Sequence, residues 1–277
     1  MKMSRRETLL TQLIGTGGGE AANRLGQLGT LVLAGWLLGV DGLGIIGFAW
    51  SLTTVAQALA QGGPELAGVR ELARAVNGVD GPVEAPARVI SEVTRLKLYL
   101  ALLAVPLLVL VGLTLGHGDQ AATAQLAVQV LAMIAMTLGY TWALRGLWRG
   151  VEQGVIRTVQ AASTLILLWP LLSVWPSPLA VPLAEAAAAV LALGVARYRL
   201  GILVHHVSPT GAGMERLIGP SLRLGLATVL ATLVWMTPIV AAARWAPIDQ
   251  VSYLTGTVRL ILGPTSPHGP TIICYIK

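Results

Sequence analysis

The sequence is poor in the residue types that form disulfides, metal sites and catalytic groups. Its 277 residues include one cysteine, Cys274, which excludes an internal disulfide and a cysteine-ligated metal cluster. It has only four histidines. We find no carboxylate pair, metal-ligand quartet or Ser/His/Asp set at a catalytic spacing. We therefore predict that the chain is not an enzyme and that it holds no cofactor and no metal.

Charge is scarce as well. Only 12% of the residues are charged, whereas a soluble domain usually carries about 25%. Hydrophobic residues make up 55% of the chain and the mean hydropathy is +0.72, which excludes an ordinary soluble domain. The net charge of +6 raises the question of a nucleic-acid partner. We reject it, because the basic residues are spread over loops in a pattern that membrane topology explains better.

Long apolar stretches without any charge make up much of the chain. Five of them are 20 to 27 residues long, namely 42–64, 98–118, 120–144, 158–184 and 224–243. A helix needs roughly 20 apolar residues to cross a bilayer. We therefore predict an all-α integral membrane protein with seven spans and an eighth that begins near Val251. The seven lie near residues 14–38, 43–63, 97–116, 122–144, 158–176, 179–197 and 221–243.

The basic residues predict the orientation of these spans. Fifteen of the 19 fall on one side: Lys2, Arg5, Arg6, Arg70, Arg74, Arg88, Arg95, Lys97, Arg145, Arg149, Arg157, Arg197, Arg199, Arg216 and Arg223. The opposite loops hold Asp41, His117, Asp119, Arg244 and almost no other charge. Because Lys and Arg accumulate in cytoplasmic loops, the N-terminus and the long loops are predicted to be cytoplasmic.

Two loops and a glycine run require separate interpretations. Segments 65–96 and 199–219 are predicted to contain amphipathic stretches at the membrane surface. His205 and His206, in the second segment, point different ways on a helix, so we expect a solvated or headgroup-facing loop there rather than a metal site. The run Gly15–Gly19 is similar to a phosphate loop but lacks the Gly-Lys-Ser/Thr ending and a preceding strand. Close helix packing is the expected role of these glycines.

The first predicted span carries a polar face. Glu20, Asn23, Arg24 and Gln27 recur at i, i+3, i+4 and i+7, which places them on one side of a helix. A charge exposed to lipid costs on the order of 3 kcal/mol, so the face is expected to look into protein or a water-filled cavity. Two interpretations stay open. One is a structural ion pair between Glu20 and Arg24, and the other is a cavity wall that handles a polar or anionic substrate.

Polar residues of other spans are expected to enclose a hydrophilic cleft with this face. The predicted substrate-binding residues are Arg24, Asn23, Gln27, Glu20, Gln57 and Arg223. Hydroxyl groups in spans are expected to form interhelical hydrogen bonds more often than ligand contacts; they include Ser51, Thr54, Thr137, Thr228 and Thr232. Glu185 is interpreted as interfacial. An aromatic belt at the span ends is predicted to consist of Trp36, Trp142, Trp148, Trp169, Trp175 and Trp245.

Two segments carry a family resemblance. Residues 33–74 read LAGWLLGVDGLGIIGFAWSLTTVAQALAQGGPELAGVRELAR, and the features that matter are Leu38-Gly39, Asp41, Gly47-Phe48, Gly62-Gly63 and Val69–Arg74. Residues 144–152 read LRGLWRGVE and are similar to the family's loop after span four. The sequence thus resembles bacterial O-antigen and polysaccharide flippases. These belong to the multidrug/oligosaccharidyl-lipid/polysaccharide exporter (MOP) superfamily, which also contains the MATE transporters.

The resemblance implies a fold, a function and a location. The fold is a six-helix transmembrane bundle plus the first helix of a second, pseudo-twofold-related bundle. The implied function is flipping of a polyprenyl-pyrophosphate-linked oligosaccharide across the bacterial cytoplasmic (inner) membrane for O-antigen or other surface polysaccharide. Arg24, Asn23, Gln27 and Arg223 would attract the pyrophosphate and sugars, and one bundle would rock against the other. The partners implied are the lipid-linked oligosaccharide, the lipid bilayer, and a polysaccharide polymerase or glycosyltransferases.

The chain is shorter than such a family would require, since its members usually have 12 to 14 spans. We predict a six-span bundle over 1–200, a cytoplasmic linker over 201–219, the start of a second bundle over 220–262 and an irregular tail over 263–277. Pro264, Pro267 and Pro270 interrupt any helix there, so we interpret the frame as truncated or shifted. Residues 34–41 align weakly with 242–249, so span seven is expected to repeat span one.

Two other functions stay open. A MATE-like small-solute antiporter would use a carboxylate buried in a span for coupling to protons or sodium, and Glu20 is the candidate for it. A non-transporting membrane fragment is the other alternative, favoured by the missing second bundle.

Overall fold

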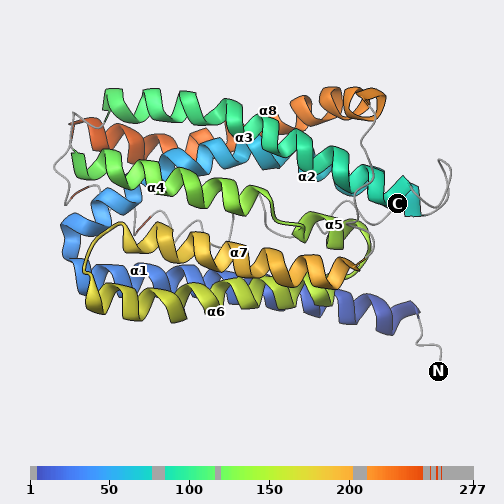
Figure 1. Ribbon diagram of the computed structural model, residues 1–277, viewed down its shortest axis with the longest axis horizontal. Helices are drawn as coiled ribbons and strands as arrows, with labels where there is room; N and C mark the ends of the chain where they lie inside the picture. The colour runs from blue at the N-terminus through green and yellow to red at the C-terminus, as the bar shows by residue number, and fades with distance from the viewer. Residues whose placement is uncertain are drawn as a thin grey trace.

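The computed structural model describes residues 5–76, 85–115, 120–201 and 211–245, together with positions 250, 254 and 257. Within these residues the chain is helical apart from short turns, and it contains no strand. The helices lie side by side along one long axis (Figure 1). Six helical segments are long and apolar enough to cross a membrane. The predicted class, an all-α multi-pass membrane protein, is confirmed.

The first of these segments contains two crossings. It runs from Leu10 to Val76, and 67 residues of helix extend about 100 Å, whereas the hydrocarbon core is ~30 Å thick. Helix α1 (Arg5–Gln57) is bent at Gly39, whose φ of 70° and ψ of −170° are accessible essentially to glycine alone. The chain reverses near this bend (Figure 1). A helical bend therefore replaces the predicted loop and divides α1 into a first arm, 5–38, and a second arm, 40–57.

The second arm continues through a π-helix, η1 (Ala58–Gly62), into α2 (Gly63–Val76). The other helices are α3 (Ala85–Leu115), α4 (Gln120–Thr137), α5 (Thr141–Gly146), α6 (Gly150–Val174), α7 (Ala180–Leu200) and α8 (Gly211–Trp245). The seven predicted spans correspond to the two arms of α1 and to helices α3, α4, α6, α7 and α8.

Several helices extend further toward the basic loops than predicted. Helix α3 begins at Ala85 rather than near 97, α6 at Gly150 rather than near 158, and α8 at Gly211 rather than near 221. The predicted boundaries followed the charged residues. A helix can nevertheless continue past the hydrocarbon, because long Arg and Lys side chains reach toward water from it. Lys97 and Arg157 therefore lie on helices, not in loops.

The first arm of α1 and helix α6 run parallel in close contact. A Cβ atom at Gly15 would lie 2.6 Å from Val151 Cα, and one at Gly19 would overlap Gly154 Cα. Further along, the rings of Trp36 and Trp169 stack with centroids 6.2 Å apart. The expected packing role of the glycine run is confirmed for Gly15 and Gly19, whereas Gly17 and Gly18 face open space.

Helix α2 packs inside the bundle and is not a separate interfacial helix as segment 65–96 predicted. Its apolar residues Ala67 and Leu72 belong to a buried cluster with Val93 of α3 and Trp142 of α5. Trp142 is 1% exposed, so its assignment to the aromatic belt was wrong. The other five tryptophans of the predicted belt are exposed: Trp36, Trp148, Trp169, Trp175 and Trp245.

Some predictions fall outside the described residues. They include the eighth span near Val251, the pair His205-His206 and the tail 263–277. The second half of the predicted linker is helical, since α8 begins at Gly211. The domain division itself stays a prediction.

Candidate functional site

Three charged side chains meet between α1 and α6. Glu20 Oε1 accepts a hydrogen bond from Arg24 Nε at 3.2 Å, and Glu20 Oε2 accepts one from Arg157 Nη1 at 2.7 Å. The three side chains are only 18–21% exposed. The expected pair between Glu20 and Arg24 is present, and the structure adds a second arginine to it. We call these three residues the charged cluster.

Because α1 packs closely on α6, the residues of the charged cluster lie at about the same position along the two helices. Arg24 and Arg157 each precede one ring of the stacked pair Trp36–Trp169 by 12 residues, roughly 18 Å along a helix. Tryptophans of this kind mark the membrane–water boundary. This spacing predicts that the two arginines lie within a hydrocarbon core of ~30 Å.

The polar face of the first arm points away from its lipid-facing side. The most exposed apolar residues of this arm include Leu25 and Val32, which lie roughly 120–140° around the helix from Glu20. Asn23 shares the polar face and is half-buried, whereas Gln27, on the same face, is exposed. The side chain of Glu20 is therefore turned toward other parts of the protein, whereas the side chain of Gln27, on the same face, is exposed.

Gln57 and Arg223 lie elsewhere. Gln57 Nε2 donates to Met136 Sδ of α4 at 3.5 Å. Arg223 is on the exposed side of α8, while Gly225 of the same helix packs against Gly63. The structure therefore brings Glu20 together with Arg24 and Arg157. Gln57 and Arg223 are not part of this cluster.

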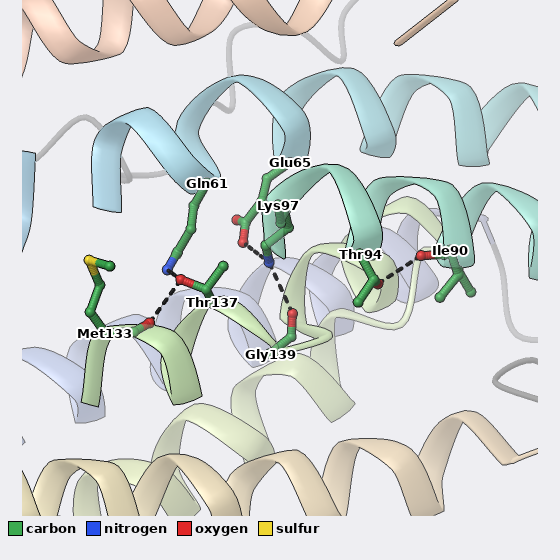
Figure 2. Close-up of polar contacts among 8 residues, drawn as sticks. All are labelled: Gln61, Glu65, Ile90, Thr94, Lys97, Met133, Thr137 and Gly139. Atoms are coloured by element: carbon green, nitrogen blue, oxygen red, sulfur yellow. Dashed lines mark hydrogen bonds and ion pairs between the residues drawn. The ribbon is translucent and has the colours of Figure 1, made fainter. Parts of the chain in front are cut away.

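A second cluster of polar residues connects several helices, where the π-helix η1 meets α3 and α4 (Figure 2). Lys97 is 1% exposed; its Nζ contacts Glu65 Oε1 at 2.7 Å and donates to the Gly139 carbonyl at 3.2 Å. Beside it, Gln61 Nε2 donates to Thr137 Oγ1 at 3.1 Å. This buried lysine was predicted to lie in a loop, because a charge at the edge of an apolar run looks like a span boundary.

The hydroxyl groups of the spans mostly bond to their own helices. Ser51 donates to the Gly47 carbonyl, Thr54 to Trp50, Thr228 to Leu224 and Thr232 to Thr228, each four residues earlier. Of the five hydroxyls considered, Thr137 takes part in a hydrogen bond between helices, as the acceptor from Gln61. The comparison of interhelical bonds with ligand contacts did not consider this arrangement, in which the hydroxyl donates to the nearer backbone carbonyl one turn back.

A cavity of about 40 Å³ lies between α4, α6 and α7 and is lined in part by Met136, Tyr140 and Gln160. It has room for about one to three water molecules and does not admit a sugar. A more open hollow of about 360 Å³ lies between the first arm of α1 and α6, lined by apolar residues that include Trp36 and Trp169. Among the described residues, no group of three His, Cys, Asp or Glu side chains is placed to hold a metal ion.

The sequence interpretation missed Arg157 as a site residue. It is the eighth residue of α6, in the sequence Gly-Val-Ile-Arg-Thr-Val, an arginine in a mostly apolar stretch. Helical periodicity alone does not show that this arginine reaches a carboxylate 137 residues earlier.

Solved transporter structures share this fold. A MATE family multidrug resistance transporter of the MOP superfamily, in an inward-facing conformation, matches with a TM-score of 0.67 and 16% identity over 89% of this chain and 60% of that one. The MATE multidrug transporter DinF-BH in complex with R6G matches with a TM-score of 0.69 and 17% identity over 95% and 62%. A MOP superfamily transporter from Pyrococcus furiosus matches with 0.64 and 15% over 91% and 62%.

This chain thus spans about three-fifths of the length of those transporters. No curated protein matches its sequence. The family model of the polysaccharide biosynthesis proteins matches residues 12–266, nearly the whole chain. The chain therefore belongs to the polysaccharide biosynthesis protein family and has the fold of the MOP superfamily transporters.

Proposed function

We propose that this protein takes part in moving a polyprenyl-pyrophosphate-linked oligosaccharide across the bacterial cytoplasmic membrane. Its membership of the polysaccharide biosynthesis family supports a glycan substrate. Its fold, shared with MOP superfamily transporters, supports transport. A polysaccharide polymerase and glycosyltransferases are the expected functional partners of such a step.

The charged cluster is the observation that carries the proposal. Two guanidinium groups share one carboxylate, so the cluster has a formal charge of +1 inside the membrane. A charge in the hydrocarbon core costs on the order of 3 kcal/mol even on lenient scales, and such sites are usually functional. A pyrophosphate would place negative charge beside the two arginines. Arginine is suited to bind it, because its planar fork matches phosphate oxygens bidentately.

Each of the predicted binding residues then has a role. Arg24 and Arg157 bind the pyrophosphate, and Glu20 holds both arginines in place when no substrate is bound. Asn23 and Gln27, on the same face, donate and accept hydrogen bonds to the sugars. Gln57 on the second arm and Arg223 on α8 meet the substrate at a later stage of translocation.

Transport requires two parts of the transporter to move relative to each other. In this proposal the substrate enters from the cytoplasmic side, where the N-terminus lies. It is exposed to the opposite side when the six-span bundle rocks against the part of the transporter that begins with α8. The cavity of about 40 Å³ between α4, α6 and α7 is too small for a sugar, which supports binding elsewhere on the bundle.

The test is binding of polyprenyl pyrophosphate to the purified chain in lipid nanodiscs. We expect Arg24→Ala and Arg157→Ala each to weaken binding at least ten-fold, and the two Lys variants to retain part of it, because charge remains but the bidentate fork is lost. Arg74→Ala, an exposed arginine on α2, is the matched control and should bind as the wild type does. Unchanged affinity in both folded Ala variants would reject the proposal.

The antiporter alternative assigns a different task to Glu20. A coupling carboxylate has to release and take up its cation, whereas Glu20 is ion-paired with two arginines. That arrangement favours a positioning role over a coupling role. Proton- or sodium-driven export of a cationic dye by the full transporter, lost in Glu20→Gln, would favour the antiporter.

A further inference from the structure

The turn between α5 and α6 holds a tryptophan in an unfavourable backbone conformation. Trp148 has a φ of 56°, a value that bulky residues seldom adopt and that glycine adopts readily. The glycines of this turn stand elsewhere, at Gly146 and Gly150, where a Cβ atom would crowd neighbouring helices. The ring of Trp148 is 48% exposed, so packing offsets only part of the conformational cost. A strained residue that stays at the surface points to a role for its side chain.

The same turn is attached to the end of α7. Arg149 Nη1 donates to the carbonyl oxygen of Arg199 at 3.0 Å, and Arg149 Nη2 pairs with Glu152 at 2.6 Å. The last turn of α7 also carries Arg197 and Tyr198, and all three of its polar side chains are exposed, Tyr198 to 84%. We define the basic–aromatic surface by four residues: Trp148, Arg197, Tyr198 and Arg199.

Helix length predicts that this surface lies at the membrane boundary. Trp148 precedes Trp169 by 21 positions, about 30 Å along α6, which matches a hydrocarbon core of ~30 Å. Helix α7 has 21 residues as well, and Arg197 and Arg199 stand in its last turn. The surface is therefore expected at the level of the lipid headgroups. It lies at the end of the bundle where α1 begins (Figure 1).

The charge of this surface is not balanced within the described part of the chain. Glu152 pairs with Arg149, whereas neither Arg197 nor Arg199 forms an ion pair with a described carboxylate. At headgroup level, lipid phosphates supply negative charge, and guanidinium groups bind phosphate bidentately. Tryptophan and tyrosine favour the same layer, because their rings are apolar at one end and polar at the other.

We propose that the basic–aromatic surface binds an anionic phospholipid, such as phosphatidylglycerol. Arg197 and Arg199 contact the phosphate, and the ring of Trp148 packs against the glycerol backbone and the upper part of an acyl chain. Arg149 is a positioning residue that holds the turn against α7. An acidic segment of another protein would meet the same arginines, but it would not require a strained tryptophan at the membrane boundary. None of these residues belongs to the charged cluster, so this inference does not depend on the proposed transport function.

Native mass spectrometry of the detergent-purified chain, with phosphatidylglycerol or phosphatidylcholine added, tests the proposal. The wild type should bind phosphatidylglycerol more tightly. Arg197→Gln and Arg199→Gln should each lower that preference roughly five-fold, since each arginine near an anionic headgroup contributes a comparable amount. Arg74→Gln makes the same charge change at an exposed position of α2 and should leave the preference unchanged.

Trp148→Gly separates binding from a purely structural role, because glycine removes both the ring and the strain. In phosphatidylcholine nanodiscs its unfolding midpoint should equal or exceed that of the wild type. Phosphatidylglycerol should raise the midpoint of the wild type, since it binds the folded state, and it should raise that of Trp148→Gly less. Trp175→Gly, which removes an exposed tryptophan at the other end of the bundle, should keep the full shift.

Several results would overturn the proposal. Equal affinity for the two lipids would leave an acidic protein segment as the partner of this surface. An equal loss of preference in Arg74→Gln would show that net charge alone attracts the lipid. Inorganic phosphate that binds at Arg197 and Arg199 more tightly than phosphatidylglycerol would reject a lipid ligand. If Trp148→Gly does not elute as a folded protein, the two exposed arginine substitutions still decide the outcome.

Discussion

Arg157 of α6 and Glu20 of α1 form a 2.7 Å ion pair across 137 positions of the sequence. Glu20 also pairs with Arg24 one turn further along its own helix. One carboxylate therefore compensates two guanidinium groups, and it is the residue on which the whole charged cluster depends. Because of this asymmetry, substitutions of the three residues are expected to differ in their effects on folding.

Glu20→Ala should reduce the amount of folded protein more than Arg24→Ala does. Loss of Glu20 leaves two arginines in the membrane without their carboxylate, whereas loss of Arg24 leaves the Glu20–Arg157 pair intact. The measurement is the folded fraction in membranes by fluorescence-detected size-exclusion chromatography. A Glu20→Ala/Arg24→Ala double variant should recover only part of the loss, since Arg157 remains. If that double variant recovers both abundance and transport completely, Arg24 is a structural residue and does not bind substrate.

Gly19→Val should destabilise the contact between α1 and α6. Any Cβ at this position overlaps Gly154 Cα, so the backbones must separate, and overpacking of this kind typically costs about 1–3 kcal/mol or more. Gly18→Val is the matched control, since nothing lies within 4 Å of its Cβ. Thermal unfolding in detergent should show a lower midpoint for Gly19→Val than for Gly18→Val. Equal midpoints would show that the two helices are not in close contact.

Lys97→Met should be strongly destabilising, because it removes the cation and leaves Glu65 facing a buried position. Breaking one partner of a buried pair costs about 3–5 kcal/mol, whereas an exposed pair contributes less than about 1 kcal/mol. Arg74→Met, which breaks the exposed pair with Glu71, is the control. Denaturant unfolding in mixed micelles should separate the two variants. The double variant Lys97→Met/Glu65→Gln should be more stable than Lys97→Met; a further loss of stability would refute the pairing.

Cysteine labelling of intact cells should show the predicted orientation, in a Cys274→Ser background. Cysteines at Asp119 and Ser177 are expected to react with a membrane-impermeant maleimide from outside. Cysteines at Asn77 and Tyr198 should react only after permeabilisation, because the positive loops are cytoplasmic. Tyr198 is 84% exposed, whereas Gln153, also on the basic side, is 2% exposed and would resist labelling on either side. The reverse pattern would invert the topology.

The sequence predicted the number of the described spans because hydrophobic length is a local property. It misplaced their ends for the same reason. Lys97 and Arg157 interrupt apolar runs and were therefore assigned to loops, although each is on a helix and reaches a specific carboxylate. The bend at Gly39 was predicted as a loop, since φ and ψ of a single glycine leave no trace in composition.

For the polar residues, too, the sequence predicted contacts within one helix but not contacts between helices. The i, i+3, i+4 and i+7 spacing was sufficient to place Glu20 and Arg24 on one face and to predict their pair, which lies within one helix. It gave no information on contacts between helices. Glu185 lies 135 positions from Trp50 and 56 from Gln129, and only the packing of α7 against its neighbours brings the three together.

The glycine contact between α1 and α6 also has a mechanical consequence. Where backbones touch without intervening side chains, as at Gly19 and Gly154, there are no rotamers to exchange, and sliding or separation would require both helices to move. We therefore expect the two helices to move as one unit, with Arg24 and Arg157 travelling together. A charge bound by both arginines would then be carried through the membrane at fixed geometry.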